Sequence, residues 1–319
     1  MCTAIAFYKD GLYFGRNLDL YYHYDESVTV IPRNYNLKLK NGKEIFCHLA
    51  IMGVATVSGG YPLYYDAVNE KGLCMAGLNF PNSAVYGSFD GSKNNVAPFE
   101  LIPYILSRCE SVGDAISQLE NINLWDISFD EKFKNTPLHW LICDKNQTVT
   151  VEPTAAGLKI YQNAVGVLTN NPPFDCQLYN LANYMNVTAR YPTNRFCGDD
   201  IIKPYSLGMG SIGLPGDTSS ASRFVRAAFI KQNSVCDNAV SQAFHILKAV
   251  EQPRGVTYTE RGECEYTLYT SVCDTGRLVY YYTTYDGGVC AVTMQNEDLD
   301  KNELVSYPLC DGGGIFYHN

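Results

Sequence analysis

The sequence has no long apolar run and no excess of basic residues. No segment of its 319 residues reaches the roughly 20 apolar residues that a membrane-spanning helix needs, and no apolar segment follows a basic start, as it would in a signal peptide. Lysine and arginine number 24 against 33 aspartate and glutamate, which gives a net charge of -9. This balance argues against nucleic acid and anionic membranes as partners. We therefore expect a cytoplasmic protein that binds neither.

Histidine is scarce, and the cysteines form no C-x-x-C pair. The five histidines show no spacing typical of metal ligands, so no metal site is predicted. The twelve cysteines are scattered along the chain. Without an export signal, we interpret them as reduced and mostly buried thiols.

One glycine pattern matches a cofactor motif but lies in the wrong context. Gly208, Gly210 and Gly213 follow the G-x-G-x-x-G pattern, which binds dinucleotides where it follows a strand and opens a helix. Here Pro204 precedes the pattern and Pro215 follows it. No dinucleotide site is therefore predicted.

The start of the chain carries the strongest chemical signal. Removal of Met1 would leave Cys2 with a free α-amino group, so that one residue would hold both a thiol nucleophile and its base. An α-amine has a pKa of roughly 7.7–8.0, and an N-terminal amine is a known activator of such a nucleophile. A Cys–His dyad stays open as an alternative, although His139 and His245 lie in apolar runs typical of core histidines.

The pattern of apolar residues and turns predicts antiparallel sheets layered with helices. Asp10-Gly11 is a strong hairpin signal between two β-prone runs. A turn-rich, aromatic loop is expected over 58–65. Helices are expected from Pro98 and over 112–119, 174–185, 221–231 and 239–250. Strands are expected over 3–8, 12–16, 27–32, 48–57, 67–68, 73–78, 138–143, 148–152, 158–161, 165–169, 266–273, 277–285, 289–294 and 304–307, with 67–68 and 73–78 forming a second hairpin. Because hairpins dominate over β-α-β units, we expect an α+β protein, and we expect residues 1–319 to form a single domain.

Two charged residues at the end of the first hairpin are candidates to act with Cys2. Arg16 and Asp19 follow the predicted second strand, which brings them near the start of the chain. Beside a buried Cys2, Arg16 would favour the thiolate. Asp19 would then anchor Arg16 or the α-ammonium group.

Amide side chains lie at the ends of two predicted strands. Asn79 and Asn170 each follow an apolar run, and Arg223 lies at the start of a predicted helix. Two amides and a backbone N–H aimed at one point would form an oxyanion hole, worth about 10²–10³ in rate per donor.

Together these pieces resemble one family, the choloylglycine hydrolases, which comprise bile salt hydrolases and penicillin V acylases within the N-terminal nucleophile hydrolase superfamily. The resemblance covers essentially the whole chain. It rests on an ordered series of motifs: Met1-Cys2-Thr3, Phe14-Gly15-Arg16-Asn17-Leu18-Asp19, Asn69-Glu70-Lys71-Gly72-Leu73, Ala76-Gly77-Leu78-Asn79-Phe80-Pro81, Leu138-His139-Trp140, Val167-Leu168-Thr169-Asn170, and Leu214-Pro215-Gly216-Asp217 with Ala221-Ser222-Arg223-Phe224.

The resemblance implies a four-layer α-β-β-α sandwich of two antiparallel sheets, cleavage of amide bonds without metal or organic cofactor, and a homotetramer. It implies that Cys2 is the nucleophile and that its freed amine is the base. Further implied roles are charge tuning by Arg16 and Arg223, orientation of Cys2 by Asp19, and oxyanion stabilisation by the Asn79 backbone N–H and the Asn170 side chain.

The resemblance also suggests the substrate. Asn79 stands where bile salt hydrolases have Asn and some penicillin V acylases have Tyr, which favours glycine- or taurine-conjugated bile salts. By motif, the sterol would contact Leu18, Tyr65, Phe129 and Phe133. Aromatic residues in loops are also typical of a ligand pocket. Penicillin V, other N-acyl amides and acyl-homoserine lactones stay open as substrates, as does a non-catalytic bile-acid-binding role.

Overall fold

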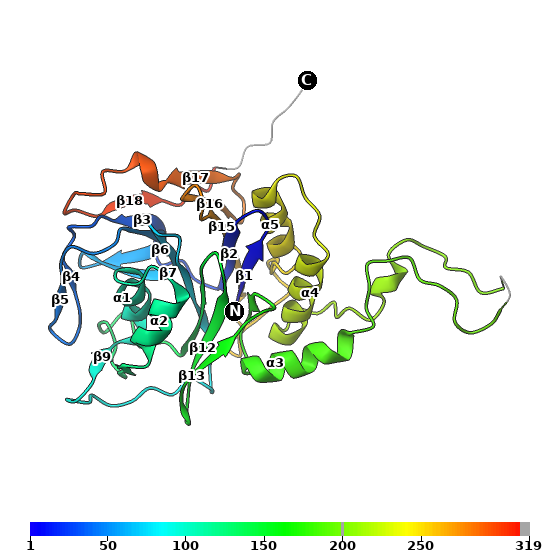
Figure 1. The fold of residues 1–319 in the computed structure, drawn as a ribbon, viewed down its shortest axis with the longest axis horizontal. Coiled ribbons are helices and arrows are strands. Elements are labelled where there is room, and N and C mark those ends of the chain that lie inside the picture. The colour runs from blue at the N-terminus through cyan, green and yellow to red at the C-terminus, as the bar shows by residue number, and fades with distance from the viewer. Residues whose placement is uncertain (199–200, 313–319) are drawn as a thin grey trace, which may run out of the picture.

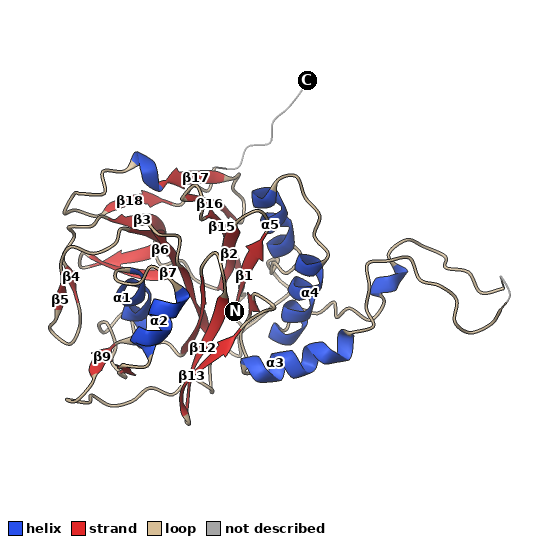
Figure 2. Ribbon diagram, viewed as in Figure 1, coloured by secondary structure: helices blue, strands red, loops and turns tan. Residues whose placement is uncertain are grey.

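Two antiparallel sheets face each other, and each is covered on its outer side by helices (Figure 1, Figure 2). The computed structural model describes residues 1–198 and 201–312. Helices α1 and α2 lie on one side of the paired sheets, and α4 and α5 lie on the other. This arrangement confirms the predicted four-layer α-β-β-α sandwich.

The six-stranded sheet carries the start of the chain in its second strand, beside the short edge strand β14. Its order is β14 (Val167–Leu168), β1 (Cys2–Tyr8), β2 (Leu12–Leu20), β15 (Tyr266–Asp274), β16 (Val279–Thr284) and β17 (Cys290–Thr293). Strand β1 is covered on both faces, so all of its residues except Tyr8 are buried. This burial explains why its sequence is a continuous apolar run rather than an alternating one. The predicted hairpin at Asp10-Gly11 joins β1 to β2, with φ of Asp10 at +52°.

The eight-stranded sheet forms the second inner layer. Its order is β13 (Gly157–Gln162), β12 (Thr148–Thr154), β11 (Leu138–Cys143), β8 (Cys74–Asn79), β7 (Tyr61–Asn69), β6 (Ile51–Ser58), β3 (Ser27–Ile31) and β18 (Val305–Pro308). Two small strand pairs were not predicted. They are β4 (Leu37–Lys38) with β5 (Glu44–Ile45), and β9 (Asn94–Val96) with β10 (Ile122–Leu124).

The prediction of a loop over 58–65 is wrong. Gly59 and Gly60, with φ of +57° and +79°, form a tight turn, and the aromatic residues after it belong to strand β7. The glycines adopt the left-handed conformation that a two-residue hairpin turn requires. Further along the two strands, the register of β6 and β7 shifts by one residue. Ala55 pairs with Tyr64, whereas Val54 pairs with Asp66. Tyr65 is therefore the extra residue of a β-bulge.

The helices begin close to where the sequence predicted them. A 3₁₀ turn, Pro98–Glu100, leads into α1 (Leu101–Leu106), and α2 (Val112–Leu119) follows. Helix α3 (Phe174–Leu181) continues into a 3₁₀ turn, Ala182–Tyr184. Helices α4 (Ser220–Gln232) and α5 (Ala239–Lys248) begin after side-chain caps from Ser219 and Asn238. No helix in the described ranges is both long enough and apolar enough to cross a membrane.

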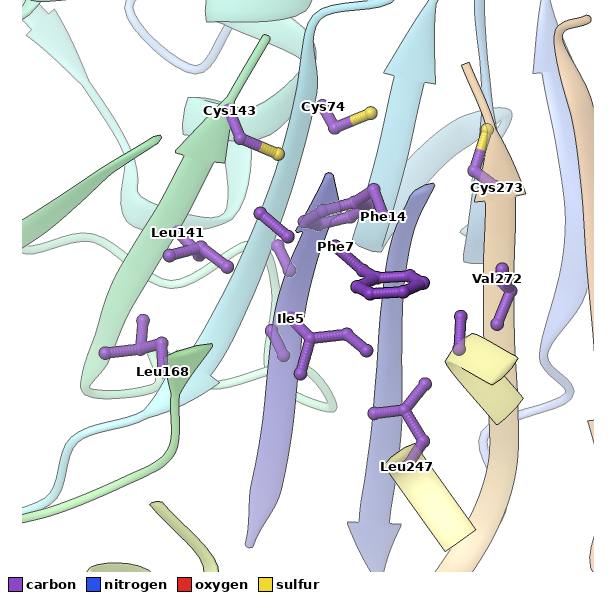
Figure 3. Packing of buried hydrophobic residues seen from close by; sticks show 14 of the residues in the cluster. Ile5, Phe7, Phe14, Cys74, Leu141, Cys143, Leu168, Leu247, Val272 and Cys273 are labelled. Atoms are coloured by element: carbon purple, nitrogen blue, oxygen red, sulfur yellow. The ribbon is translucent and has the colours of Figure 1, made fainter. Parts of the chain in front are cut away.

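Two apolar layers hold the six-stranded sheet in place (Figure 3). Phe14 points between the sheets, in the region of Cys74 and Cys273, whereas Ile5 points toward Leu247 of α5. These side chains are almost completely buried. The strand that carries Cys2 is thus fixed from both sides.

Between α3 and α4 the chain extends away from the body and returns (Figure 1). We call the described residues of 185–217 the arm; it includes a 3₁₀ turn, Met209–Ser211. Phe196, Tyr205 and Leu207 of the arm are each more than 80% exposed, at 89%, 84% and 85%. The G-x-G-x-x-G pattern lies here, without a preceding strand.

Candidate active site

Cys2 begins strand β1 at the edge of a cavity. Its side chain is 3% exposed, and it lines the cavity together with Arg16 and Asn79. Its backbone N–H donates a hydrogen bond to Asn170 Oδ1 over 2.8 Å. That nitrogen is the atom that removal of Met1 would convert into an amine.

Asn170 connects three parts of the site. It follows β14, and its backbone N–H donates to Ser220 Oγ at 2.8 Å. Its Nδ2 donates to the Asn79 carbonyl at 2.7 Å, while its Oδ1 accepts from Cys2. Because both ends of the side-chain amide are bonded, its orientation is fixed. The two asparagines predicted at strand ends therefore lie in direct contact.

Arg223 links helix α4 to the start of β1. Its Nη1 donates to the Cys2 carbonyl and to Thr3 Oγ1, both at 2.6 Å. Its Nη2 donates to Asn170 Oδ1 at 2.9 Å. The side chain is fully buried, and this desolvation lowers its pKa, although Asp19 and Cys2 act in the opposite direction.

Arg16 is held on the other side of Cys2 by backbone carbonyls. Its Nη1 donates to the carbonyls of Tyr65 at 2.7 Å and Gly77 at 3.0 Å. Its carboxylate partner is Asp66, whose Oδ1 lies 4.0 Å from Arg16 Nε. Burial alone would lower the pKa of Arg16, but the acidic groups of Cys2, Tyr269 and Asp66 raise it.

The first of the two anchoring roles suggested for Asp19, holding Arg16, does not match the geometry. Asp19 Oδ1 accepts from Thr267 Oγ1 at 2.6 Å, and its Oδ2 is buried without a hydrogen-bond donor among the described residues. Its backbone N–H and carbonyl pair with Met1. Asp19 thus lies beside the N-terminus, and its negative charge favours the ammonium form there. The carboxylate that faces Arg16 is that of Asp66, which lies on the inner face of β7 opposite Val54.

The cavity extends from Cys2 between aromatic walls. Its volume is about 410 Å³. All four residues predicted to contact a sterol line it, namely Leu18, Tyr65, Phe129 and Phe133. Tyr65 reaches it from strand β7 rather than from a loop, whereas Phe129 and Phe133 lie between β10 and β11. The prediction missed Tyr24, Leu20 and Leu63 on the same walls, since single apolar residues near strand ends carry no distinctive signal.

The histidine alternative lacks the required contact. His139 is buried, and its two ring nitrogens lie 3.1 Å from Glu152 Oε1 and 2.8 Å from the Thr169 carbonyl. His245 is exposed, so its interpretation as a core residue is wrong. In the described ranges, neither histidine is hydrogen-bonded to Cys2, and no three histidine, cysteine, aspartate or glutamate side chains converge so as to hold a metal ion.

The fold and this site together define an N-terminal nucleophile hydrolase. Residues 2–307 match the family model described as linear amide C-N hydrolases, choloylglycine hydrolase family. The chain belongs to that family. It is 48% identical over 314 residues to a bile salt hydrolase/transferase of Lactiplantibacillus plantarum, with 97% of each protein covered.

Solved structures agree with this assignment. The C2A mutant of the conjugated bile acid hydrolase from Clostridium perfringens matches with a TM-score of 0.94 and 35% identity, and all of both chains is covered. Penicillin V acylase from Agrobacterium tumefaciens matches with a TM-score of 0.75 and 20% identity over 96% of this chain and 90% of that one. The second likeness supports the fold alone.

Proposed function

We propose that this chain is a bile salt hydrolase that cleaves the amide bond of glycine- or taurine-conjugated bile acids. The observation that carries the proposal is that Cys2 lies at one end of an aromatic-walled cavity and within the hydrogen-bond network of Asn170 and Arg223. A volume of about 410 Å³ is within the range of small-molecule sites. The identities of the relatives point to the same substrate class.

In the proposed acylation step, the freed α-amine of Cys2 takes the thiol proton and the sulfur attacks the scissile carbonyl carbon. The Asn170 side chain and the Asn79 backbone N–H stabilise the resulting oxyanion. The α-ammonium group then gives its proton to the leaving nitrogen as the C–N bond breaks. Glycine or taurine departs, and the bile acyl group remains as a thioester on Cys2.

In the proposed deacylation step, water loses a proton to the same amine and attacks the thioester. The C–S bond breaks, the thiol is restored, and the free bile acid leaves. Arg16 and Arg223 keep positive charge on both sides of Cys2 throughout. Asp19, with one carboxylate oxygen unpartnered in the described structure, orients the ammonium group.

The test is release of glycine from glycocholate and of taurine from taurocholate by the chain lacking Met1, with penicillin V assayed in parallel and Cys2→Ala as the control. Release from the bile salts that disappears in Cys2→Ala is the expected result. Cleavage of penicillin V alone would replace the proposal with the acylase alternative. Cleavage of none of the three would favour a binding role.

Hydrolysis is expected to fall at acid pH, because protonation of the α-amine removes the base. A free α-amine has a pKa of roughly 7.7–8.0, so kcat/KM should fall as the pH drops below about 8. A pH profile of kcat/KM checks this, and a rate that is flat from about pH 4 to 8 would contradict the assignment of the amine.

We further propose a homotetramer in which the arm is buried between copies. Its exposed aromatic and aliphatic side chains suit a protein interface better than water. Replacing Phe196, Tyr205 and Leu207 together by serine is expected to yield smaller assemblies in light scattering. The matched control is Val235→Ser with Val289→Ser, two exposed valines on the body. A tetramer that survives the arm substitutions would overturn the assignment of the interface.

A cytoplasmic location is the third proposal. It is supported by the twelve cysteines, which are scattered along the chain without a C-x-x-C pair, as is usual for reduced thiols.

A further inference from the structure

Asp66 is an ionisable side chain that the proposed reaction does not use. It lies fully buried between the sheets, where an unpaired carboxylate costs several kcal/mol. Three hydroxyl groups from the six-stranded sheet donate to it. Tyr269 donates to Oδ1 at 2.6 Å, Ser271 donates to Oδ2 at 3.2 Å, and Tyr280 also donates to Oδ2. Burial nevertheless raises the pKa of Asp66, against the effects of Arg16 and these donors.

The fourth neighbour of Asp66 is the guanidinium group of Arg16. The Nε edge of that group faces Asp66 Oδ1 at 4.0 Å, and Nη1 is bonded to the carbonyls of Tyr65 and Gly77. Neither Nε nor Nη2 has a hydrogen-bond acceptor among the described residues, so Asp66 acts on the Nε edge through its charge. The side chain lines the cavity beside Cys2. The two carbonyls fix Nη1, the Asp66 carboxylate attracts the Nε edge, and Nη2 is left for the reaction.

The β-bulge explains how one short segment provides two of these contacts. In a regular strand, successive side chains alternate between faces. At the bulge, Tyr65 packs against the inner core and Asp66 bonds to Tyr269 across the same inner face. The backbone of Tyr65 and the side chain of Asp66 can therefore both reach Arg16.

A stability role alone does not account for this cluster. Replacing a buried ion pair by apolar residues of similar size is often neutral or stabilising, and the surrounding core is apolar. A buried carboxylate with three hydroxyl donors, 4.0 Å from a guanidinium beside the candidate nucleophile, is better explained by the need to hold one geometry.

We propose that Asp66 is a positioning residue for Arg16. Its charge attracts the Nε edge of the guanidinium at 4.0 Å and offsets part of the positive charge, and the carboxylate is itself held by Tyr269, Ser271 and Tyr280. The inference rests on the proposed function for its effect on catalysis. Its effect on the Cys2 thiol does not depend on which substrate is cleaved.

The test uses Asp66→Asn in the chain lacking Met1. The first measurement is the pH dependence of Cys2 alkylation by iodoacetamide, followed by mass spectrometry of the N-terminal peptide. Removing the carboxylate leaves the positive charge of Arg16 less compensated, so the midpoint of the alkylation profile should shift to lower pH, by about half a unit or more. Ionisable groups facing Asp66 are Arg16, Tyr269 and Tyr280, and the two tyrosines stay uncharged at the pH of the assay.

The second measurement separates kcat from KM for bile salt cleavage. A misplaced Arg16 should lower kcat by about 10- to 100-fold, with KM changed by less than about three-fold, since the cavity walls are untouched. The matched control is Asp274→Asn, which removes another buried carboxylate, on β15 of the six-stranded sheet. It lies 3.9 Å from Arg277, and its backbone pairs with Tyr13 at the far end of β2.

Asp274→Asn is expected to move neither readout. An unchanged alkylation midpoint in Asp66→Asn, or a shift to higher pH, would overturn the proposal even if bile salts prove not to be substrates. A fall in kcat that Asp274→Asn reproduces would do the same. If Asp66→Asn does not fold, Tyr280→Phe replaces it. That variant keeps the carboxylate but removes one donor, so a smaller shift in the same direction is expected, and no shift would reject the role.

Discussion

Replacing Asn170 by alanine is expected to lower kcat/KM for amide cleavage by about 10²–10³-fold, the usual cost of one oxyanion donor. The substitution removes the Nδ2 donor and also the Oδ1 acceptor that holds the Cys2 nitrogen at 2.8 Å. Arg223 would lose its partner at 2.9 Å as well. The measurement is kcat/KM with bile salts, together with a melting temperature to show that the variant is folded.

The neighbouring residue provides the control for this prediction. Asn171 carries the same side chain, but its Nδ2 donates to the Pro81 carbonyl and to Ser83 Oγ, away from Cys2. Asn171→Ala should therefore keep kcat/KM within a few-fold of the parent. An Asn170→Ala enzyme that kept more than about a third of the parental rate would exclude a role in oxyanion stabilisation.

The largest expected effect on stability is that of Gly53→Ala in β6. A Cβ atom at this position would lie 2.0 Å from the Asp66 carbonyl oxygen and 2.5 Å from Ala67 Cα. Both are backbone atoms of the central strand β7, so they cannot move aside without separating the two strands. We expect a loss of about 3 kcal/mol or more in the free energy of unfolding, measured by urea denaturation.

Gly113→Ala in helix α2 is the matched control. A Cβ there would meet only Ser111 Oγ, at an ordinary 3.6 Å. Its effect on the free energy of unfolding should not exceed about 1 kcal/mol. Equal destabilisation by the two substitutions would show that the close approach of β6 and β7 is not the reason why position 53 requires glycine.

The sequence predicts best those features that are encoded locally. The apolar run after Cys2, the Asp10-Gly11 turn and the helical patterns over 221–231 and 239–250 depend on neighbouring residues, and the elements they indicate are present. The site is predictable to the extent that strand ends collect polar side chains. Asn79 and Asn170 are placed together for this reason.

The carboxylate partner of Arg16, Asp66, cannot be predicted from neighbouring residues. Asp66 lies fifty positions along the chain, within an aromatic segment whose glycines and proline are typical of a loop. Only the pairing of β6 with β7 shows that Asp66 lies on the inner face, opposite Val54, and that Tyr65 is an extra residue beside it. The donors to Asp66 come from β15 and β16, more than two hundred positions along the chain from it, and no local pattern links them to it.

Tyr65, the bulge residue, has two separate functions, one carried by its side chain and the other by its backbone. Its ring forms part of the cavity wall, while its carbonyl oxygen accepts the hydrogen bond from Arg16. Every amino acid has that carbonyl, so the ring can be exchanged for a larger or smaller group without removing the arginine's acceptor. Point substitutions at this position can thus tune which acyl groups fit while the reactive centre is inherited unchanged. An insertion or deletion here has no such freedom, because it alters both at once.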